Sequence, residues 1–173
     1  MVSQPVLTIS LVDKLQTDSR PTGSPSTQAE TTLTTLDEIK QVAGIVLVPR
    51  YLPVGFQLTE SRLVSFQTHH AKFLTYEANE GRGRQSFDLG QLELAAITCK
   101  RGYASEITIN GRPAYVIEGG WASVDGAPID WHPNIARSVY CEADGGVAFV
   151  SSIGENRLDR TSMIQILESL AEY

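Results

Sequence analysis

The feature that most constrains the fold of this chain is the dipeptide Asn110-Gly111 between two alternating runs of residues. Apolar and polar residues alternate in 105–109 and again in 112–116, which is the period of a half-buried strand. An Asn-Gly pair suits a two-residue type I′ turn because both of its central residues need a positive φ. We therefore predict a β-hairpin over 105–121, with the other elements placed beside it or across it.

Residues 1–32 differ in composition from the rest of the chain. Apolar residues alternate in 5–12, which predicts an edge strand. Residues 16–32 are rich in Ser, Thr, Pro and Gly without apolar periodicity, and such a segment buries too little surface to offset its ordering entropy. We therefore divide the chain into a flexible arm or linker, 1–32, and a single domain, 33–173.

Capping signals predict a helix at each end of this domain. Thr35 and Glu38 have the spacing of a capping box before a helix over 36–43, and Asp159 is placed to cap a second helix over 160–173. Between the two helices the pattern predicts a packed extended segment over 45–56 and an irregular loop over 121–137. It also predicts, besides the hairpin, strands over 57–67, 71–78, 85–98, 138–142 and 147–153, with a break in the third of these at Gly90. The fold class is α+β: an antiparallel sheet of about six to seven strands with both helices packed on one face.

Charge and cysteine content narrow the function classes. The net charge of −6, from 14 basic and 20 acidic residues, argues against a nucleic-acid partner bound by phosphate neutralisation. Cys99 and Cys141 belong to no Cys/His cluster, and the adjacent His69 and His70 would point to opposite faces of an extended segment, so we expect no metal site. The two cysteines are either separate buried thiols or one disulfide, which would imply an oxidising compartment.

The loop 121–137 carries the candidate site residues. Trp121 and Trp131 bracket it, and large aromatic residues in a loop anchor a partner, line a ligand cleft or cover a sheet edge. Asp125, Asp130 and His132 supply two carboxylates and an imidazole, which could perform acid–base chemistry. Asp-Gly and Asp near Pro are also ordinary turn chemistry, which is the interpretation we prefer.

Several stretches resemble a bacterial domain family of unknown function. These are LVPRYLPVGFQL (47–58), FLTYEAN (73–79), LELAAIT (92–98), the hairpin around Ile-Asn-Gly, and the closing ESLA (168–171). Members of the family are extracytoplasmic domains of membrane-anchored proteins, among them anti-sigma-factor-like proteins, and are distantly similar to the lipoprotein-carrier fold. The resemblance covers about residues 33–172, and the loop 121–137 is longer than the family pattern.

The resemblance implies an extracytoplasmic location with a membrane tether on the N-terminal side, and a cytoplasmic location is the alternative. It implies a non-catalytic sensor or interaction domain that needs no cofactor and binds a protein or a small apolar ligand. A lipid or lipoprotein-type carrier is the alternative, and a hydrolase using Asp125, Asp130 and His132 is a remote one. On the binding hypothesis, Trp131→Ala weakens binding and leaves the domain folded.

Overall fold

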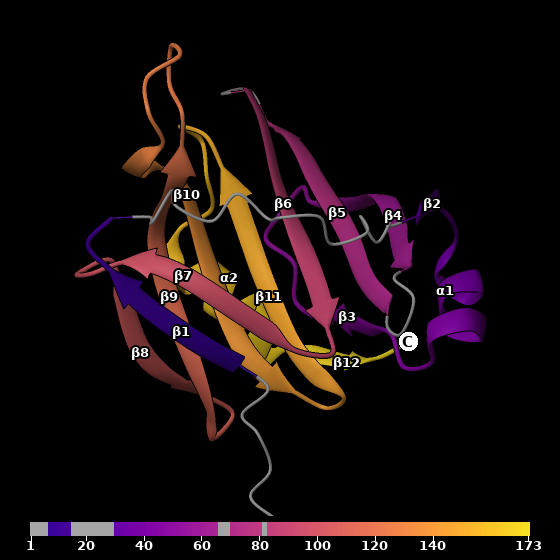
Figure 1. Ribbon diagram of the computed structural model, residues 1–173. Helices are drawn as coiled ribbons and strands as arrows, with labels where there is room; N and C mark the ends of the chain where they lie inside the picture. Colours follow the sequence, from indigo (N-terminus) through magenta and orange to yellow (C-terminus); the bar gives the residue numbers. More distant parts are fainter. Residues whose placement is uncertain (1–6, 15–29, 66–69, 81–82) are drawn as a thin grey trace, which may run out of the picture.

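A computed structural model describes residues 7–14, 30–65, 70–80 and 83–173 (Figure 1). Residues 1–6 and 15–29 lie outside this description, and with them most of the predicted linker. The described part is mostly β: a large antiparallel sheet, two smaller strand pairs and two α-helices. This agrees with the predicted α+β class in its broad outline.

The main sheet has eight strands rather than the predicted six to seven. Their spatial order is β2-β4-β5-β6-β11-β10-β9-β8, and every neighbouring pair is antiparallel. The strands are β2 (Glu30–Leu33), β4 (Gln57–Ser65), β5 (His70–Glu80), β6 (Gly83–Leu92), β8 (Ala104–Ile109), β9 (Arg112–Ala122), β10 (Asp130–Ala143) and β11 (Gly146–Ile153).

The predicted Asn-Gly hairpin is confirmed as β8 and β9. Ile109 pairs with Arg112 across the turn, and both turn residues have positive φ, 49° at Asn110 and 77° at Gly111. The hairpin nevertheless lies at one side of the sheet, where β8 is the edge strand. The sheet centre is formed by β6, β11 and β10, which the local turn signal did not reveal.

Helix α1 (Leu36–Ala43) begins with the predicted capping box. The backbone N–H of Glu38 donates to Thr35 Oγ1 (3.3 Å), and that of Thr35 donates to Glu38 Oε2 (2.9 Å). The helix lies beside β4 near one end of the sheet and fully buries only Ile39 (Figure 1). Its placement thus differs from the predicted pair of helices on a shared face.

Helix α2 (Arg160–Glu168) packs across β8, β10 and β11 behind the sheet, as Figure 1 shows. Asp159 caps it as predicted, because Asp159 Oδ1 accepts a hydrogen bond from the Ser162 backbone N–H (3.0 Å). The predicted helix was too long, since the chain leaves α2 at Glu168 and forms strand β12 (Leu170–Glu172). That strand pairs with β3 (Leu47–Pro49), so pairing with a distant strand makes the last residues of the chain extended rather than helical.

The extended segment predicted at 45–56 is packed only in part, because Val46, Leu47 and Phe56 are buried whereas Ile45, Tyr51 and Val54 are exposed. Its strand β3 is held by the buried Gln91 of β6, whose two amide atoms both bond to the backbone of Leu47. The Leu47 N–H donates to Gln91 Oε1 (2.8 Å), and Gln91 Nε2 donates to the Leu47 carbonyl (2.7 Å). A buried polar side chain thus attaches a short strand through both ends of its amide.

A second layer covers the opposite face of the sheet. Strands β1 (Leu7–Val12) and β7 (Ala95–Lys100) pair in parallel and cross over β9, β10 and β11 (Figure 1). The edge strand predicted at 5–12 is therefore a strand, but it belongs to this layer. The strand predicted at 85–98 is two strands: β6 runs through Gly90 to Leu92, and β7 then leaves the main sheet.

A separate hydrophobic core lies on each face of the main sheet. The core on the α2 side includes Ile39, Leu74, Phe87, Leu89, Val116, Val139, Val150, Met163 and Ile166, and the opposite core includes Leu7, Ala95, Ile117, Trp131 and Val147. Cys141 belongs to the first and Cys99 to the second, and both are free buried thiols. Of the two alternatives left open by the sequence, the structure has separate thiols rather than a disulfide.

Candidate functional site

The predicted irregular loop 121–137 is mostly strand. Strand β10 begins at Asp130, where Asp130 pairs with Ala122 and Trp131 pairs with Trp121. Only 123–129 remains as a loop, and Figure 1 shows this tip projecting beyond the end of the main sheet. The prediction failed because Asp125-Gly126 and two prolines indicate turns throughout this segment, whereas the structure accommodates Pro133 in an irregularity of β10 between His132 and Arg137.

The two tryptophans fasten the base of this tip to the second layer. Trp131 is only 6% exposed and packs edge-on against Trp121, with ring centroids 5.2 Å apart, and beside Tyr103 at 5.6 Å. Trp121 Nε1 donates a hydrogen bond to the Thr98 carbonyl of β7 (3.0 Å). Trp131 is therefore a core side chain. The expectation that Trp131→Ala leaves the domain folded assumed an exposed tryptophan, and the structure has a buried one.

Gly119 makes room for this arrangement. It has φ of 100°, and a Cβ there would lie 2.7 Å from Trp131 Nε1 and 2.6 Å from the His132 carbonyl oxygen. A side chain at this position of β9 would clash with the backbone of β10 and with the Trp131 ring. Trp131 Nε1 is buried and has no hydrogen-bond partner among the described residues.

The structure places two of the three predicted acid–base residues, Asp130 and His132, near each other on β10 and leaves Asp125 in the tip. Asp130 Oδ1 accepts a hydrogen bond from the Trp131 N–H (2.7 Å) and lies 3.6 Å from Lys100 Nζ. That hydrogen bond and the Lys100 charge hold the pKa of Asp130 below its usual value. His132 shares β10 with Asp130, but within the described residues Asp125 bonds to neither of them. Asp125 instead adopts φ of 53° in an exposed Asp-Gly turn, the interpretation that we preferred.

The tip itself presents apolar side chains to solvent. Val124 is 44% exposed and Ile129 is 54% exposed, and they flank the exposed Asp125. The loop has internal order, because the Ala127 N–H donates to the Val124 carbonyl (3.0 Å) and the Ser123 hydroxyl donates to the Ala127 carbonyl. The tip is thus a small, shaped surface on a fixed base.

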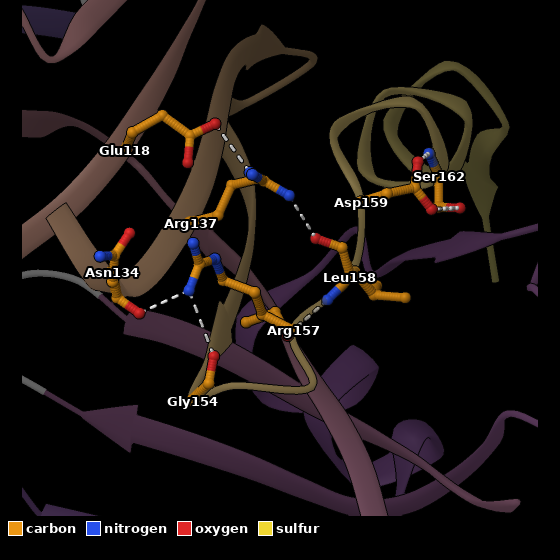
Figure 2. Close-up of polar contacts among 9 residues, drawn as sticks. Glu118, Asn134, Arg137, Gly154, Arg157, Leu158, Asp159 and Ser162 are labelled. Atoms are coloured by element: carbon orange, nitrogen blue, oxygen red, sulfur yellow. Dashed lines mark hydrogen bonds and ion pairs between the residues drawn. The ribbon is translucent and has the colours of Figure 1, made fainter. Parts of the chain in front are cut away.

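Two arginines that the sequence analysis did not single out fix the irregular part of β10 (Figure 2). Arg137 Nε donates to Glu118 Oε1 (2.7 Å), and its Nη1 donates to the Leu158 carbonyl (2.9 Å) just before α2. Arg157 Nη1 donates to the Asn134 carbonyl (2.5 Å). The two guanidinium groups thereby tie β9 and β10 to the segment that leads into α2. A proline-asparagine pair inside an otherwise strand-like run was the signal available for this irregularity.

Two hollows lie at the other end of β10, around the turn into β11. The first has a volume of about 200 Å³ and lies among β5, β6 and this turn. The second, of about 180 Å³, lies under the end of α2. Leu47, Ala143 and Asp144 line both hollows; of the predicted site residues only Cys141 lines one of them, the second, and none from the loop 121–137 does. Sequence analysis missed them because their walls come from elements distant in the chain.

Comparisons with known proteins give no relative: no family model, no curated protein and no solved structure matches this chain. Within the described residues, no helix is both long enough and apolar enough to cross a bilayer. The same residues contain no group of three or more His, Cys, Asp or Glu side chains that could hold a metal ion.

Proposed function

We propose that this chain is a non-catalytic interaction domain that binds a protein partner through the β9–β10 tip, residues 123–129. The observation that carries the proposal is the exposure of Val124 and Ile129 on a projecting loop whose base is packed into the core. Exposed apolar side chains are common on protein surfaces when they stand singly. Here two of them share one projecting tip, which a concave partner surface could enclose.

The fixed base favours binding energetically. Burial of each apolar side chain in a partner stabilises the complex by about 1.5–3 kcal/mol. The packed pair Trp121 and Trp131 keeps the ends of the loop in place, so little further ordering is needed on association. The exposed carboxylates of Asp125 and Asp130 lie at and beside the tip, which favours a partner with basic groups around an apolar pocket.

The proposed setting is extracytoplasmic, as a sensor or interaction module tethered to a membrane on the N-terminal side. Its support is the resemblance of residues 33–172 to extracytoplasmic bacterial domains, above all the stretch LVPRYLPVGFQL. An antibody raised against the purified chain should detect the protein in the envelope fraction of the source cells. Its recovery only with cytoplasmic markers would refute the proposed location and leave the tip proposal to its own test.

The tip is tested by a double substitution, Val124→Ser with Ile129→Ser. A matched control replaces two exposed apolar residues elsewhere, Leu33 and Val54, which are 67% and 87% exposed, by serine. Each protein is immobilised and exposed to an envelope extract, and bound species are quantified by mass spectrometry. We expect one species to be bound by the wild type and the control and to lose about a hundredfold in affinity for the tip variant, since about 3 kcal/mol of apolar burial is removed. Equal recovery of every species on all three proteins would refute the proposal.

A small apolar ligand is a second candidate, favoured by the hollow of about 180 Å³ under α2. Ile109, Leu167 and Leu170 give it an apolar wall. Its size is below the roughly 300–1,000 Å³ of common ligand pockets, so a lipid chain would need the core to open. Native mass spectrometry beside a denatured spectrum tests this: extra mass that is lost on denaturation would support a ligand, and a bare protein would favour the interaction domain.

A further inference from the structure

The hollow of about 200 Å³ contains a partly buried lysine that makes a single hydrogen bond within the described residues. Lys72 of β5 lines this hollow, and its Nζ donates a hydrogen bond to the Ile45 carbonyl. Within the described residues this carbonyl is its only hydrogen-bond acceptor, and no ion pair includes it. An ammonium group carries three donors, so two remain for a ligand. Burial lowers the pKa of Lys72, which indicates that protein replaces part of its hydration.

A carboxylate stands at the rim of the same hollow. Glu93 is exposed, and its charge raises the pKa of Lys72, although the two groups form no ion pair. Asp144 also lines the hollow, but its Oδ1 is already bound by Arg112 Nη2 at 2.6 Å. Among the described charged groups that line the hollow, Lys72 and Glu93 belong to no ion pair, and the imidazole of His70 also lines it, with its Nδ1 3.1 Å from Ser65 Oγ.

The remaining lining mixes polar and apolar groups, and the hollow is partly open to solvent. Gln91 also lines the hollow; it bonds to Leu47 through one N–H and one lone pair of its amide, so one N–H and one lone pair remain. Ile45, Leu92 and Val147 supply apolar surface. The volume lies below that of pockets for drug-sized ligands, so an occupant has at most about ten non-hydrogen atoms.

We propose that this hollow binds a small zwitterion of the α-amino-acid type, with its carboxylate on Lys72, its ammonium facing Glu93 and its side chain against the apolar wall. Charge-assisted hydrogen bonds to the carboxylate would complete the donors of the lysine. The hollow lies at the opposite end of β10 from the tip, so this inference is independent of the interaction proposed for residues 123–129.

The test is a titration of the ¹⁵N-labelled protein with L-alanine, with acetate and methylammonium as probes of one charge each. The wild type should show saturable shifts of the Glu93, Gly145 and Gly146 amide signals with L-alanine, at an affinity on the order of millimolar. Lys72→Met should weaken this binding at least about tenfold, because a charge-assisted bond is lost. Lys100→Met, a control lysine that lies near Asp130 instead, should bind as the wild type does.

Glu93→Gln provides a second variant at an exposed position where folding is not at stake. It should weaken binding of L-alanine and leave that of acetate unchanged. Unsaturable shifts with L-alanine, or equal binding by wild type and Lys72→Met, would overturn the site. Acetate binding as tightly as L-alanine, with no effect of Glu93→Gln, would overturn the zwitterion as its ligand.

Discussion

Trp131→Ala tests whether the aromatic side chain at the base of the tip belongs to the core. Trp131 is 6% exposed and forms ring pairs with Trp121 and Tyr103. Removing a buried aromatic side chain costs about 3–5 kcal/mol of unfolding free energy. The substitution also removes an indole N–H that has no partner among the described residues, which returns about 1 kcal/mol. We therefore expect a net loss of about 3 kcal/mol, or roughly 6–12 °C in Tm for a chain of this size.

Urea unfolding followed by far-UV circular dichroism measures this loss without relying on the fluorescence of the replaced tryptophan. Trp131→Phe keeps most of the ring and removes the unpartnered N–H, so it should cost only about 1 kcal/mol. Val124→Ala at the exposed tip is the control and should change the stability by less than about 0.5 kcal/mol. A loss below about 0.5 kcal/mol for Trp131→Ala would refute the packing argument and restore Trp131 as a candidate binding residue.

Gly90→Ala should destabilise the protein by about 1–3 kcal/mol in the same urea assay, because the new Cβ would lie 2.1 Å from Cε1 of the Phe149 ring. An unchanged midpoint would show that the ring moves freely. Hydrogen bonds from Ser162, chiefly from its hydroxyl, lower the pKa of Asp159 in the folded protein below the ordinary value of 3.8. The Asp159 carboxylate therefore stabilises the fold above pH 3.8, and this stabilisation is lost as the pH falls through the lower pKa of the folded state. The stability difference between wild type and Asp159→Ala should therefore shrink below pH 3.8, and a constant difference would contradict this. Burial raises the pKa of both thiols, that of Cys141 to about 11, so iodoacetamide at pH 8 should label Cys99 and Cys141 only after unfolding. Intact-mass spectra of the folded and unfolded protein would show this, and rapid labelling of the folded protein would be the contrary result.

Signals that act within a few residues were predictable from sequence. The Asn110-Gly111 turn, the capping box at Thr35 and the cap at Asp159 all occur where expected. Each depends on backbone angles or hydrogen bonds that a short segment satisfies by itself. The same reasoning gave the position of most strands and the broad α+β class.

The candidate site was harder to predict because exposure depends on distant partners. Trp131 follows two turn signals, Asp125-Gly126 and Pro128, and an aromatic residue in such a position can be either a loop anchor or a core residue. Trp131 became a core residue because β7 left the main sheet and crossed over β9 and β10. The Lys72 hollow was not predictable either, since residues from α1, β5, β6 and the β10–β11 turn line it together.

Local signals in the sequence were enough to predict the turns, the starts of the helices and the residues that alternate between two faces of a sheet. The order of the strands, the second layer and the end of α2 at Glu168, just before β12 pairs with β3, follow from contacts between distant parts of the chain. The physical reason is the range of the interactions. Turn and cap energies depend on neighbours in the chain, whereas strand order and burial depend on surfaces that meet only after the chain has folded.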